Sequence, residues 1–176
     1  MAEGGGRILE LYILRHGIAV PHGTKGIPED DRPLTSQGKK KMRQAARGMV
    51  TLDLDFSFIL TSPLPRASQT AQIVAEVLKS EEKIQVMEEL LPGRPPQAAA
   101  ARLSDFKKER SFLLVGHEPH LSELISYLVF GNEHGNILLK KGGLARIDIH
   151  TFSSPRGKLS WLLTPKQLRL LGRCKG

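Results

Sequence analysis

The sequence predicts an α/β domain of three layers, α/β/α, with helices on both faces of a mostly parallel central sheet that has an antiparallel edge. Short apolar runs alternate along the chain with longer segments whose apolar residues recur with the helical period, as expected of such a domain. The early apolar runs are not interrupted by regularly spaced polar residues, which is typical of strands buried on both faces of a parallel sheet. Near the C-terminus the period changes to two, which indicates an antiparallel pair of strands.

The predicted strands are short and apolar. The first covers Ile8 to Leu14 and is interrupted only by Glu10. A second buried strand is expected at residues 56–60, a short third strand at 84–87 and a fourth at 112–115. The antiparallel hairpin is expected from residues 145–149 and 159–163, which flank the turn signal Ser-Pro-Arg-Gly at residues 154–157.

The predicted helices fill the segments between these strands. Thr35 is a good N-cap for the first helix, because its hydroxyl can accept a hydrogen bond from a free backbone N–H. This helix has an apolar stripe at positions i, i+3, i+4, i+7 and i+8, namely Met42, Ala45, Ala46, Met49 and Val50. Further helices are expected at about residues 66–79, 98–106, 121–131 and 165–171. Residues 7–172 are expected to form a single domain, with flexible termini at residues 1–6 and 173–176.

The composition excludes several classes of protein. The 176 residues are 40% hydrophobic and 25% charged, which is typical of a globular domain. The single cysteine, Cys174, has no partner for an intrachain disulfide or for a cysteine-based zinc site, so a cytoplasmic location is expected. No apolar run is long enough to cross a bilayer and no signal peptide is recognisable, so no membrane partner is expected.

The formal net charge of +8 raises the alternative of a nucleic-acid partner. The basic residues are densest at residues 39–41, 107–110 and 140–141, but aromatic residues are not interleaved with them. Only 5% of the chain is aromatic, so a platform for stacking bases is not expected. The favoured interpretation is that these basic residues lie on solvated helix faces and loops and do not bind nucleic acid. A general attraction for anionic substrates is compatible with both interpretations.

Charged and titratable side chains directly follow three predicted strands: Arg15 with His16, Arg66, and His117. In an α/β protein, ligands bind at the carboxyl ends of the parallel strands, so these side chains are expected to meet there. Arg66 also begins a helix, where free N–H groups favour an anion. Two arginines, two histidines and a helix N-terminus together predict a pocket for a dianion, above all a phosphoryl group.

These residue types suit phosphoryl transfer. A neutral imidazole is a competent nucleophile toward phosphorus and forms a phosphohistidine intermediate. Fixed arginines can stabilise the charge that the transition state spreads over the phosphoryl oxygens. The sequence has no Walker glycine loop, no HExxH motif and no dense cluster of metal-ligating residues. The predicted site therefore uses no metal ion and no cofactor.

Four motifs resemble those of the histidine phosphatase superfamily, also called the phosphoglycerate mutase-like fold. The first is Leu-Arg-His-Gly at residues 14–17, and the second is Ser-Pro-Leu-x-Arg-Ala-x-Gln-Thr-Ala at residues 62–71. Arg-Pro-Leu-Thr at residues 32–35 resembles the segment before the family's first helix, and Val-Gly-His at residues 115–117 resembles the motif that carries the second histidine. The size of the chain and the lack of a large insertion resemble the short SixA-type phosphohistidine phosphatases in particular.

The resemblance implies a role for each matching residue. His16 would be the nucleophile that accepts the phosphoryl group, and Arg15 and Arg66 would bind its oxygens. His117 would be the second catalytic histidine, in contact with the phosphate. Arg32 would contribute to the same pocket. Glu89 is the candidate proton donor, because many members of the family carry their acid at that place.

The loop at residues 18–23 and Glu118 depart from the family pattern. The loop lacks the asparagine that is common in mutase-type members. Glu118 could hydrogen-bond a pocket histidine and raise its basicity, or it could point to solvent. A surface position is the simpler interpretation of both Glu118 and Arg32, whereas His22 and His120 could lie at the rim of the pocket. An imidazole leaving group needs less help than an alkoxide, so a phosphohistidine substrate could dispense with the acid.

The sequence as a whole predicts a metal-independent phosphatase that works through a phosphohistidine enzyme intermediate. The expected substrate is phosphohistidine on a protein, such as a histidine phosphotransfer domain. The loop and helix between the third and fourth predicted strands, which could cover the pocket, total only about two dozen residues. Such a short cover would leave the pocket open to the surface of another protein. The alternative is a phosphatase for a small phosphoester, such as a phosphorylated metabolite or sugar. A mutase is disfavoured, because that chemistry needs a closed site. A non-catalytic phosphate-binding module is disfavoured, because the nucleophile His16 is present. The sequence does not predict the oligomeric state.

Overall fold

The computed structural model describes residues 8–106, 108–150 and 157–173, and a six-stranded sheet forms its centre. The strands are β1 (Leu9–Arg15), β2 (Phe58–Thr61), β3 (Ile84–Val86), β4 (Ser111–Gly116), β5 (Leu144–Ile149) and β6 (Gly157–Leu163). Their order across the sheet is β3-β2-β4-β1-β5-β6. The first four strands are parallel, and β5 is antiparallel to both β1 and β6. The predicted parallel sheet with an antiparallel edge is confirmed.

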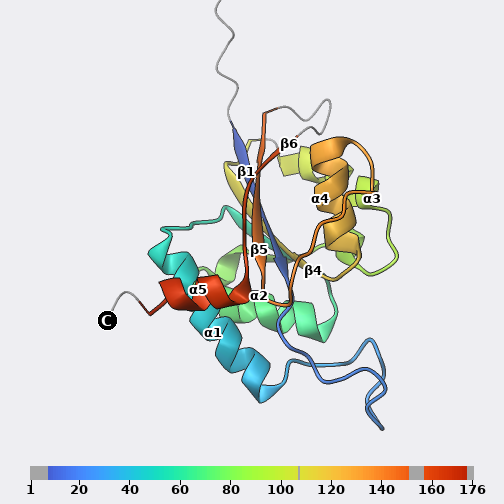
Figure 1. The fold of residues 1–176 in the computed structure, drawn as a ribbon, viewed down its shortest axis with the longest axis vertical. Helices are drawn as coiled ribbons and strands as arrows, with labels where there is room; N and C mark the ends of the chain where they lie inside the picture. The colour runs from blue at the N-terminus through green and yellow to red at the C-terminus, as the bar shows by residue number, and fades with distance from the viewer. Residues whose placement is uncertain (1–7, 107, 151–156, 174–176) are drawn as a thin grey trace, which may run out of the picture.

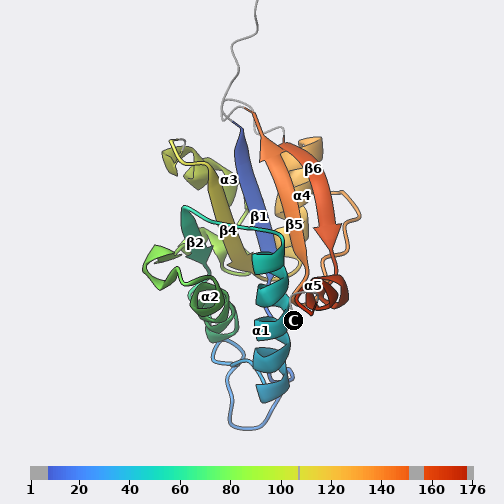
Figure 2. The same cartoon turned by 90° about the vertical axis from the view of Figure 1, so that its left-hand side faces the viewer.

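Helices cover both faces of this sheet (Figures 1 and 2). One face carries α1 (Ser36–Thr51), α2 (Pro65–Leu78) and α5 (Pro165–Leu171), and the other carries α3 (Pro96–Leu103) and α4 (His120–Phe130). Alternate residues of β1 pack into two separate apolar clusters, with Tyr12 and Leu14 in one and Leu11 and Ile13 in the other. The predicted three-layer α/β/α arrangement is therefore confirmed.

Most elements lie within two residues of their predicted bounds. The helix expected at residues 98–106 differs, because it begins two residues earlier, at Pro96, and gives way after Leu103 to the 3₁₀ turn η3 (Ser104–Phe106). Proline suits the first turn of a helix, where its missing N–H has no partner to lose. Two further 3₁₀ turns, η1 (Glu81–Lys83) and η2 (Glu88–Leu90), flank β3. Of the predicted turn at 154–157, only Gly157 is among the described residues. Of the predicted flexible termini, only Arg173 is described.

Local signals account for the ends of two helices. Thr35 caps α1 as predicted, because its hydroxyl accepts a hydrogen bond from the N–H of Gly38 at 2.9 Å. Gly131 ends α4 in the left-handed conformation, with φ of 78°, which glycine adopts without strain. No helix in the described residues is long and apolar enough to cross a membrane.

The sheet register places the ends of three strands side by side. Arg15 of β1 lies opposite Gly116 of β4, and Thr61 of β2 lies opposite Val115. Beyond the strands, the N–H of His16 donates to the carbonyl oxygen of Gly116 at 3.0 Å. The residues that follow β1, β2 and β4 therefore leave the sheet at one edge, as the sequence predicted.

Gly48 in α1 packs against α5 with no room for a side chain. A Cβ atom at this position would lie 2.0 Å from the carbonyl oxygen of Leu168. Because the obstacle is backbone, Gly48→Ala must push the two helices apart, and we expect it to lower the free energy of unfolding by about 2–3 kcal/mol. Urea unfolding measures this change, with Arg47→Ala on the exposed face of α1 as the control. Equal stability of the two variants would show that the helix contact is not tight.

Candidate active site

A hollow of about 320 Å³ opens at the carboxyl edge of the parallel strands. Arg15 ends β1 and His16 follows it, while His117 follows β4. Arg66 lies in the first turn of α2 and completes the group of four that the sequence predicted for one pocket. The structure brings all four to the wall of this hollow. The other lining residues come from loops: Pro21, His22, Glu29, Arg32, Pro92, Glu118 and Lys141.

The orientation of the buried His16 ring determines which of its nitrogens is free. Its Nδ1 lies 2.7 Å from the carbonyl oxygen of Gly17. A carbonyl oxygen only accepts hydrogen bonds, so the neutral ring must carry its hydrogen on Nδ1 and donate it. Nε2 is then left with its lone pair, which is the form that a nucleophilic histidine requires.

The surroundings of His16 keep its ring neutral. Burial, together with the positive charges of Arg66, Arg15 and Lys141, lowers the pKa of His16 to about 4, although the hydrogen bond to Gly17 acts in the opposite direction. The imidazole is therefore unprotonated at neutral pH. A neutral ring among fixed cations can attract an anionic phosphoryl group and still attack it.

This lowered pKa predicts the sign of the pH dependence. Because the neutral imidazole is the reactive form, activity is expected to persist above the pKa of His16 and to fall as the pH drops through about 4. The measurement is the pH profile of kcat/KM, corrected for ionisation of the substrate. An acid limb near the ordinary histidine value of 6.5 would contradict the buried neutral ring.

His117 lies beside His16, with the two ring centroids 5.2 Å apart. Its Nε2 lies 2.8 Å from the hydroxyl oxygen of Ser62, the first residue of the second motif. Its Nδ1 is buried and has no hydrogen-bond partner among the described residues. Burial, followed by the neighbouring His16 and Arg66, lowers the pKa of His117 to about 3. Both pocket histidines are therefore neutral at physiological pH.

Arg15 and Arg66 are each held by one backbone carbonyl group. Nη1 of Arg15 donates to the carbonyl oxygen of Leu139 at 3.0 Å, and its Nε is buried without a partner among the described residues. Nη1 of Arg66 donates to the carbonyl oxygen of Glu29 at 2.9 Å. A guanidinium has five N–H donors, so each arginine is fixed in place and keeps donors for an anion.

Arg32 lies in the pocket wall, so the surface position favoured from the sequence is wrong. Its side chain is 13% exposed, and its Nη1 donates to the carbonyl oxygen of Val20 at 2.7 Å. The Glu29 carboxylate pairs with Arg32 and His22 and lies 3.8 Å from Nη2 of Arg66. Hydrogen bonds from Arg32 and His22 lower the pKa of Glu29 to about 2. Glu29 thus links two arginines, through its carboxylate to Arg32 and through its backbone to Arg66.

Thr70 of the second motif connects the loop after β1 to α2. Its hydroxyl accepts a hydrogen bond from the N–H of Gly17 at 3.0 Å and donates one to the carbonyl oxygen of Arg66 at 2.7 Å. A Cβ atom at Gly17 would lie 2.7 Å from Cγ of Met42, so the close approach of α1 favours glycine here. The two hydrogen bonds of Thr70 therefore fix the position of the loop that follows His16 relative to the first turn of α2, which carries Arg66.

The two carboxyl groups considered for proton transfer have different positions. Glu89, partly buried in η2, is not among the residues that line the hollow. Glu118 does line it, contrary to the surface interpretation, and its carboxylate accepts hydrogen bonds from the N–H and the hydroxyl of Ser122. Burial raises the pKa of Glu118, while Ser122 and Arg15 act in the opposite direction. A carboxyl group with a raised pKa in a pocket is a candidate acid.

Sequence reasoning missed two charged residues of the pocket, Glu29 and Lys141. Glu29 belongs to an acidic run next to Arg32, and Lys141 belongs to one of the densest basic groups, but neither pattern pointed to a site. Of the two histidines considered for the rim, His22 lines the pocket with its side chain 83% exposed. His120 is buried in the first turn of α4 and does not line it.

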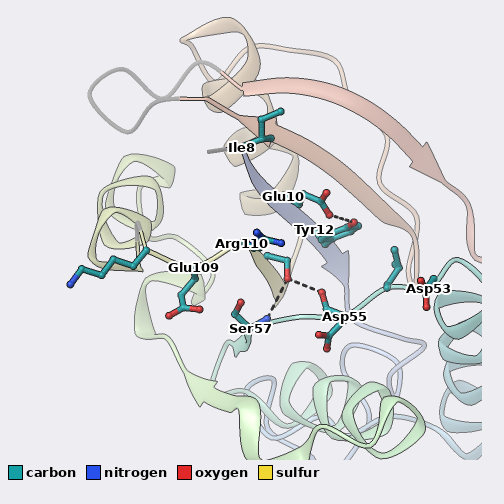
Figure 3. Close-up of a pocket in the computed structure, with 11 residues that line it drawn as sticks. Ile8, Glu10, Tyr12, Asp53, Asp55, Ser57, Glu109 and Arg110 are labelled. Atoms are coloured by element: carbon teal, nitrogen blue, oxygen red, sulfur yellow. Dashed lines mark hydrogen bonds between the residues drawn. The ribbon is translucent and has the colours of Figure 1, made fainter. Parts of the chain in front are cut away.

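A larger hollow, of about 760 Å³, lies at the opposite edge of the sheet, where β1, β2 and β4 begin (Figure 3). Its described lining residues include four carboxylates and two cations but no histidine. Polar groups there already pair with one another, as when Tyr12 donates to Glu10 at 2.8 Å. This hollow lacks the nucleophile and the concentration of positive charge found at the carboxyl edge. Among the described residues, no group of three or more His, Cys, Asp or Glu side chains is arranged to hold a metal ion.

Comparison with known proteins agrees with this geometry. Residues 11–91 match the model of the histidine phosphatase superfamily, branch 1. The chain is 36% identical over 169 residues to an uncharacterised protein of Picosynechococcus sp. (strain ATCC 27264 / PCC 7002 / PR-6), a match that covers 91% of this chain and 99% of the other. It is 25% identical over 164 residues to the phosphohistidine phosphatase SixA of Escherichia coli (strain K12), which covers 92% of this chain and 98% of SixA.

Solved structures extend the similarity to the whole fold. The protein histidine phosphatase SixA complexed with tungstate matches with a TM-score of 0.81 and 25% identity, covering 91% of this chain and 99% of that one. The alpha-ribazole phosphatase of Shigella flexneri matches with a TM-score of 0.71 at 20% identity, over 89% of this chain and 97% of that one. The four motifs, the shared fold and these relatives lead to one assignment. The chain belongs to the histidine phosphatase superfamily.

Proposed function

We propose that this protein is a metal-independent phosphatase that works through a phosphohistidine enzyme intermediate. The observation that carries the proposal is the contact of His16 Nδ1 with the carbonyl oxygen of Gly17 at 2.7 Å, because this contact places the ring hydrogen on Nδ1 and leaves Nε2 free. Arg15, Arg66 and His117 line the same hollow and can hold the phosphoryl oxygens. Membership of the superfamily and the similarity to SixA support phosphatase activity.

In the proposed first step, the Nε2 lone pair of His16 forms a bond to phosphorus while the bond from phosphorus to the leaving nitrogen or oxygen breaks. The leaving group takes up a proton as it departs. In the second step, a water oxygen attacks phosphorus and the bond to Nε2 breaks, which releases inorganic phosphate and restores His16. The arginines stabilise the charge on the equatorial oxygens in both transition states.

We further propose that the physiological substrate is phosphohistidine on a protein. SixA is named for this substrate, and the SixA structure in the comparison holds tungstate, an oxyanion. The segment between β3 and β4 supports access by a protein surface. Its helix α3 packs into the core through Ala99 and Leu103, and among the described residues of this segment only Pro92 lines the pocket. A cytoplasmic site of action, proposed from the single Cys174, suits this substrate.

Glu118 is the proposed proton donor, in preference to Glu89, because it lines the pocket and has a raised pKa. We expect Glu118→Gln to lower kcat for alkyl phosphates by about 10²-fold, since an alkoxide must be protonated as it leaves. For p-nitrophenyl phosphate, whose leaving group needs little help, we expect a change of less than about threefold. Glu89→Gln is the matched control. Equal losses for both substrates in Glu118→Gln, or a selective loss in Glu89→Gln, would reject this assignment.

The proposed function is tested by a comparison of turnover on three substrates: a phosphohistidine protein, a phosphoserine peptide and a set of small phosphoesters. We expect the highest kcat/KM for the phosphohistidine protein, and the same rates with and without a chelator. A strong preference for sugar phosphates would reject the protein substrate and leave the histidine mechanism intact. Loss of activity in the chelator would reject metal independence.

A further inference from the structure

A second hollow, of about 210 Å³, adjoins the first at Lys141, which lines both. Three cations line the second hollow: Lys41 of α1, Lys141 and Arg169 of α5. Its described lining residues include no aspartate or glutamate. We call this hollow the second anion site. Its positive charge favours a negatively charged occupant over a neutral one.

The three cations have no ion-pair partner among the described residues. Several other arginines are paired with carboxylates, as Arg43 is with Glu76 at 2.8 Å and Arg146 is with Asp148 at 2.8 Å. Lys41, Lys141 and Arg169 make no such pair. The charges of these three lining residues are therefore available to an external anion.

The backbone connects the second anion site directly to the nucleophile. The N–H of Gly142 donates to the carbonyl oxygens of Arg15, at 3.0 Å, and His16, at 3.1 Å. Gly17 and Gly142 both line the second site, so its wall begins one residue beyond His16. The second anion site therefore lies beside the residues that carry the nucleophile, and Lys141 lines both hollows.

The size of the second anion site limits what it can hold. Its volume of 210 Å³ is below the roughly 300–1,000 Å³ of sites that enclose whole ligands. Met42 and Ala45 of α1 provide a small apolar surface at its wall. These dimensions suit the end of a side chain or a single anionic group.

We propose that this hollow binds a carboxylate or phosphoryl group that the substrate carries next to its scissile phosphoryl group. This inference rests on the proposed phosphatase function. For a phosphohistidine protein, the matching feature is an aspartate or glutamate beside the phosphorylated histidine. For a small phosphoester, it is a carboxylate or a second phosphoryl group. The site would therefore select among substrates without taking part in the chemistry.

The test compares two phosphohistidine peptides that differ only in having aspartates or asparagines around the phosphohistidine. The variants are Lys41→Ala and Arg169→Gln, and the controls are Lys40→Ala on α1 and Lys166→Ala on α5, whose side chains are exposed and do not line the site. We expect each variant to raise KM for the acidic peptide about fivefold, with kcat unchanged. For the asparagine peptide, and for both peptides in the controls, we expect changes below about twofold.

Phosphoglycolate and its amide provide a second pair, which identifies the source of the anion. A fivefold effect on the acidic peptide alone assigns the site to acidic proteins, and the same effect on phosphoglycolate alone assigns it to small acidic phosphoesters. If Lys41→Ala and Arg169→Gln leave KM unchanged, or raise it equally for the acidic and the amide forms, the second anion site is overturned. Normal turnover by the wild type in the same experiment would still uphold the phosphatase. Failure of the wild type to hydrolyse any of the four compounds would overturn the proposed function and this inference with it.

Discussion

Replacing His16 with alanine is expected to reduce kcat by at least about 10³-fold on every substrate. The alanine variant lacks the Nε2 atom that forms the bond to phosphorus, so the remaining groups can only assist a direct attack by water. Arg15, Arg66 and His117 still line the pocket, so KM should change much less than kcat. Steady-state kinetics with p-nitrophenyl phosphate and with a phosphohistidine protein measure both constants.

The matched control is His134→Ala, which removes an exposed histidine that is not in the pocket. It should keep wild-type kinetics. Thermal unfolding of His16→Ala should show a folded protein, since its buried imidazole is replaced by a smaller apolar group. A folded His16→Ala variant as active as the wild type would reject His16 as the nucleophile.

The second large effect is expected for Arg66→Ala, which should lower kcat/KM by about 10²- to 10³-fold. Arg66 is 4% exposed, and burial makes its charge more effective on a phosphoryl oxygen than the same charge in water. The variant also leaves the carbonyl oxygen of Glu29 without its hydrogen bond, so the loop that carries Arg32 loses one of its attachments.

Arg66→Lys separates charge from geometry. Lysine keeps the positive charge but lacks the planar fork that can bond Glu29 and a phosphoryl oxygen at once, so we expect it to recover only part of the activity. Arg94→Ala, an exposed arginine outside the pocket, is the control. An Arg66→Ala variant within about threefold of the wild type would remove this arginine from the proposed phosphate site.

The parts of the site that follow from strand ends could be predicted from the sequence. Arg15 and His16 after β1, and His117 after β4, are placed by the parallel register of the central strands, which apolar runs make recognisable. Arg66 follows from the same reasoning, since it opens the helix after β2. The three layers could be predicted because α1, α2 and α4 have clear apolar stripes.

The contributions of loops could not be predicted in this way. Glu29 and Arg32 lie in a segment without helical or strand periodicity. Their positions depend on a hydrogen bond across the loop, from Arg32 to Val20, and on one from Arg66, which follows 37 residues after Glu29. Lys141 reaches the pocket because Gly142 bonds to the end of β1, a contact across more than a hundred residues. Burial of Glu118 depends on how α4 begins, because Ser122 holds its carboxylate.

The most direct test of the account is to identify the phosphorylated residue during turnover. The enzyme is mixed with excess phosphohistidine protein and quenched in alkali, in which phosphohistidine survives, and its peptides are then analysed by mass spectrometry. We expect one phosphoryl group on the peptide that contains His16, attached at Nε2, and none in His16→Ala. A phosphoryl group on another residue, or turnover with no phosphorylated enzyme at any time after mixing, would contradict the proposed mechanism.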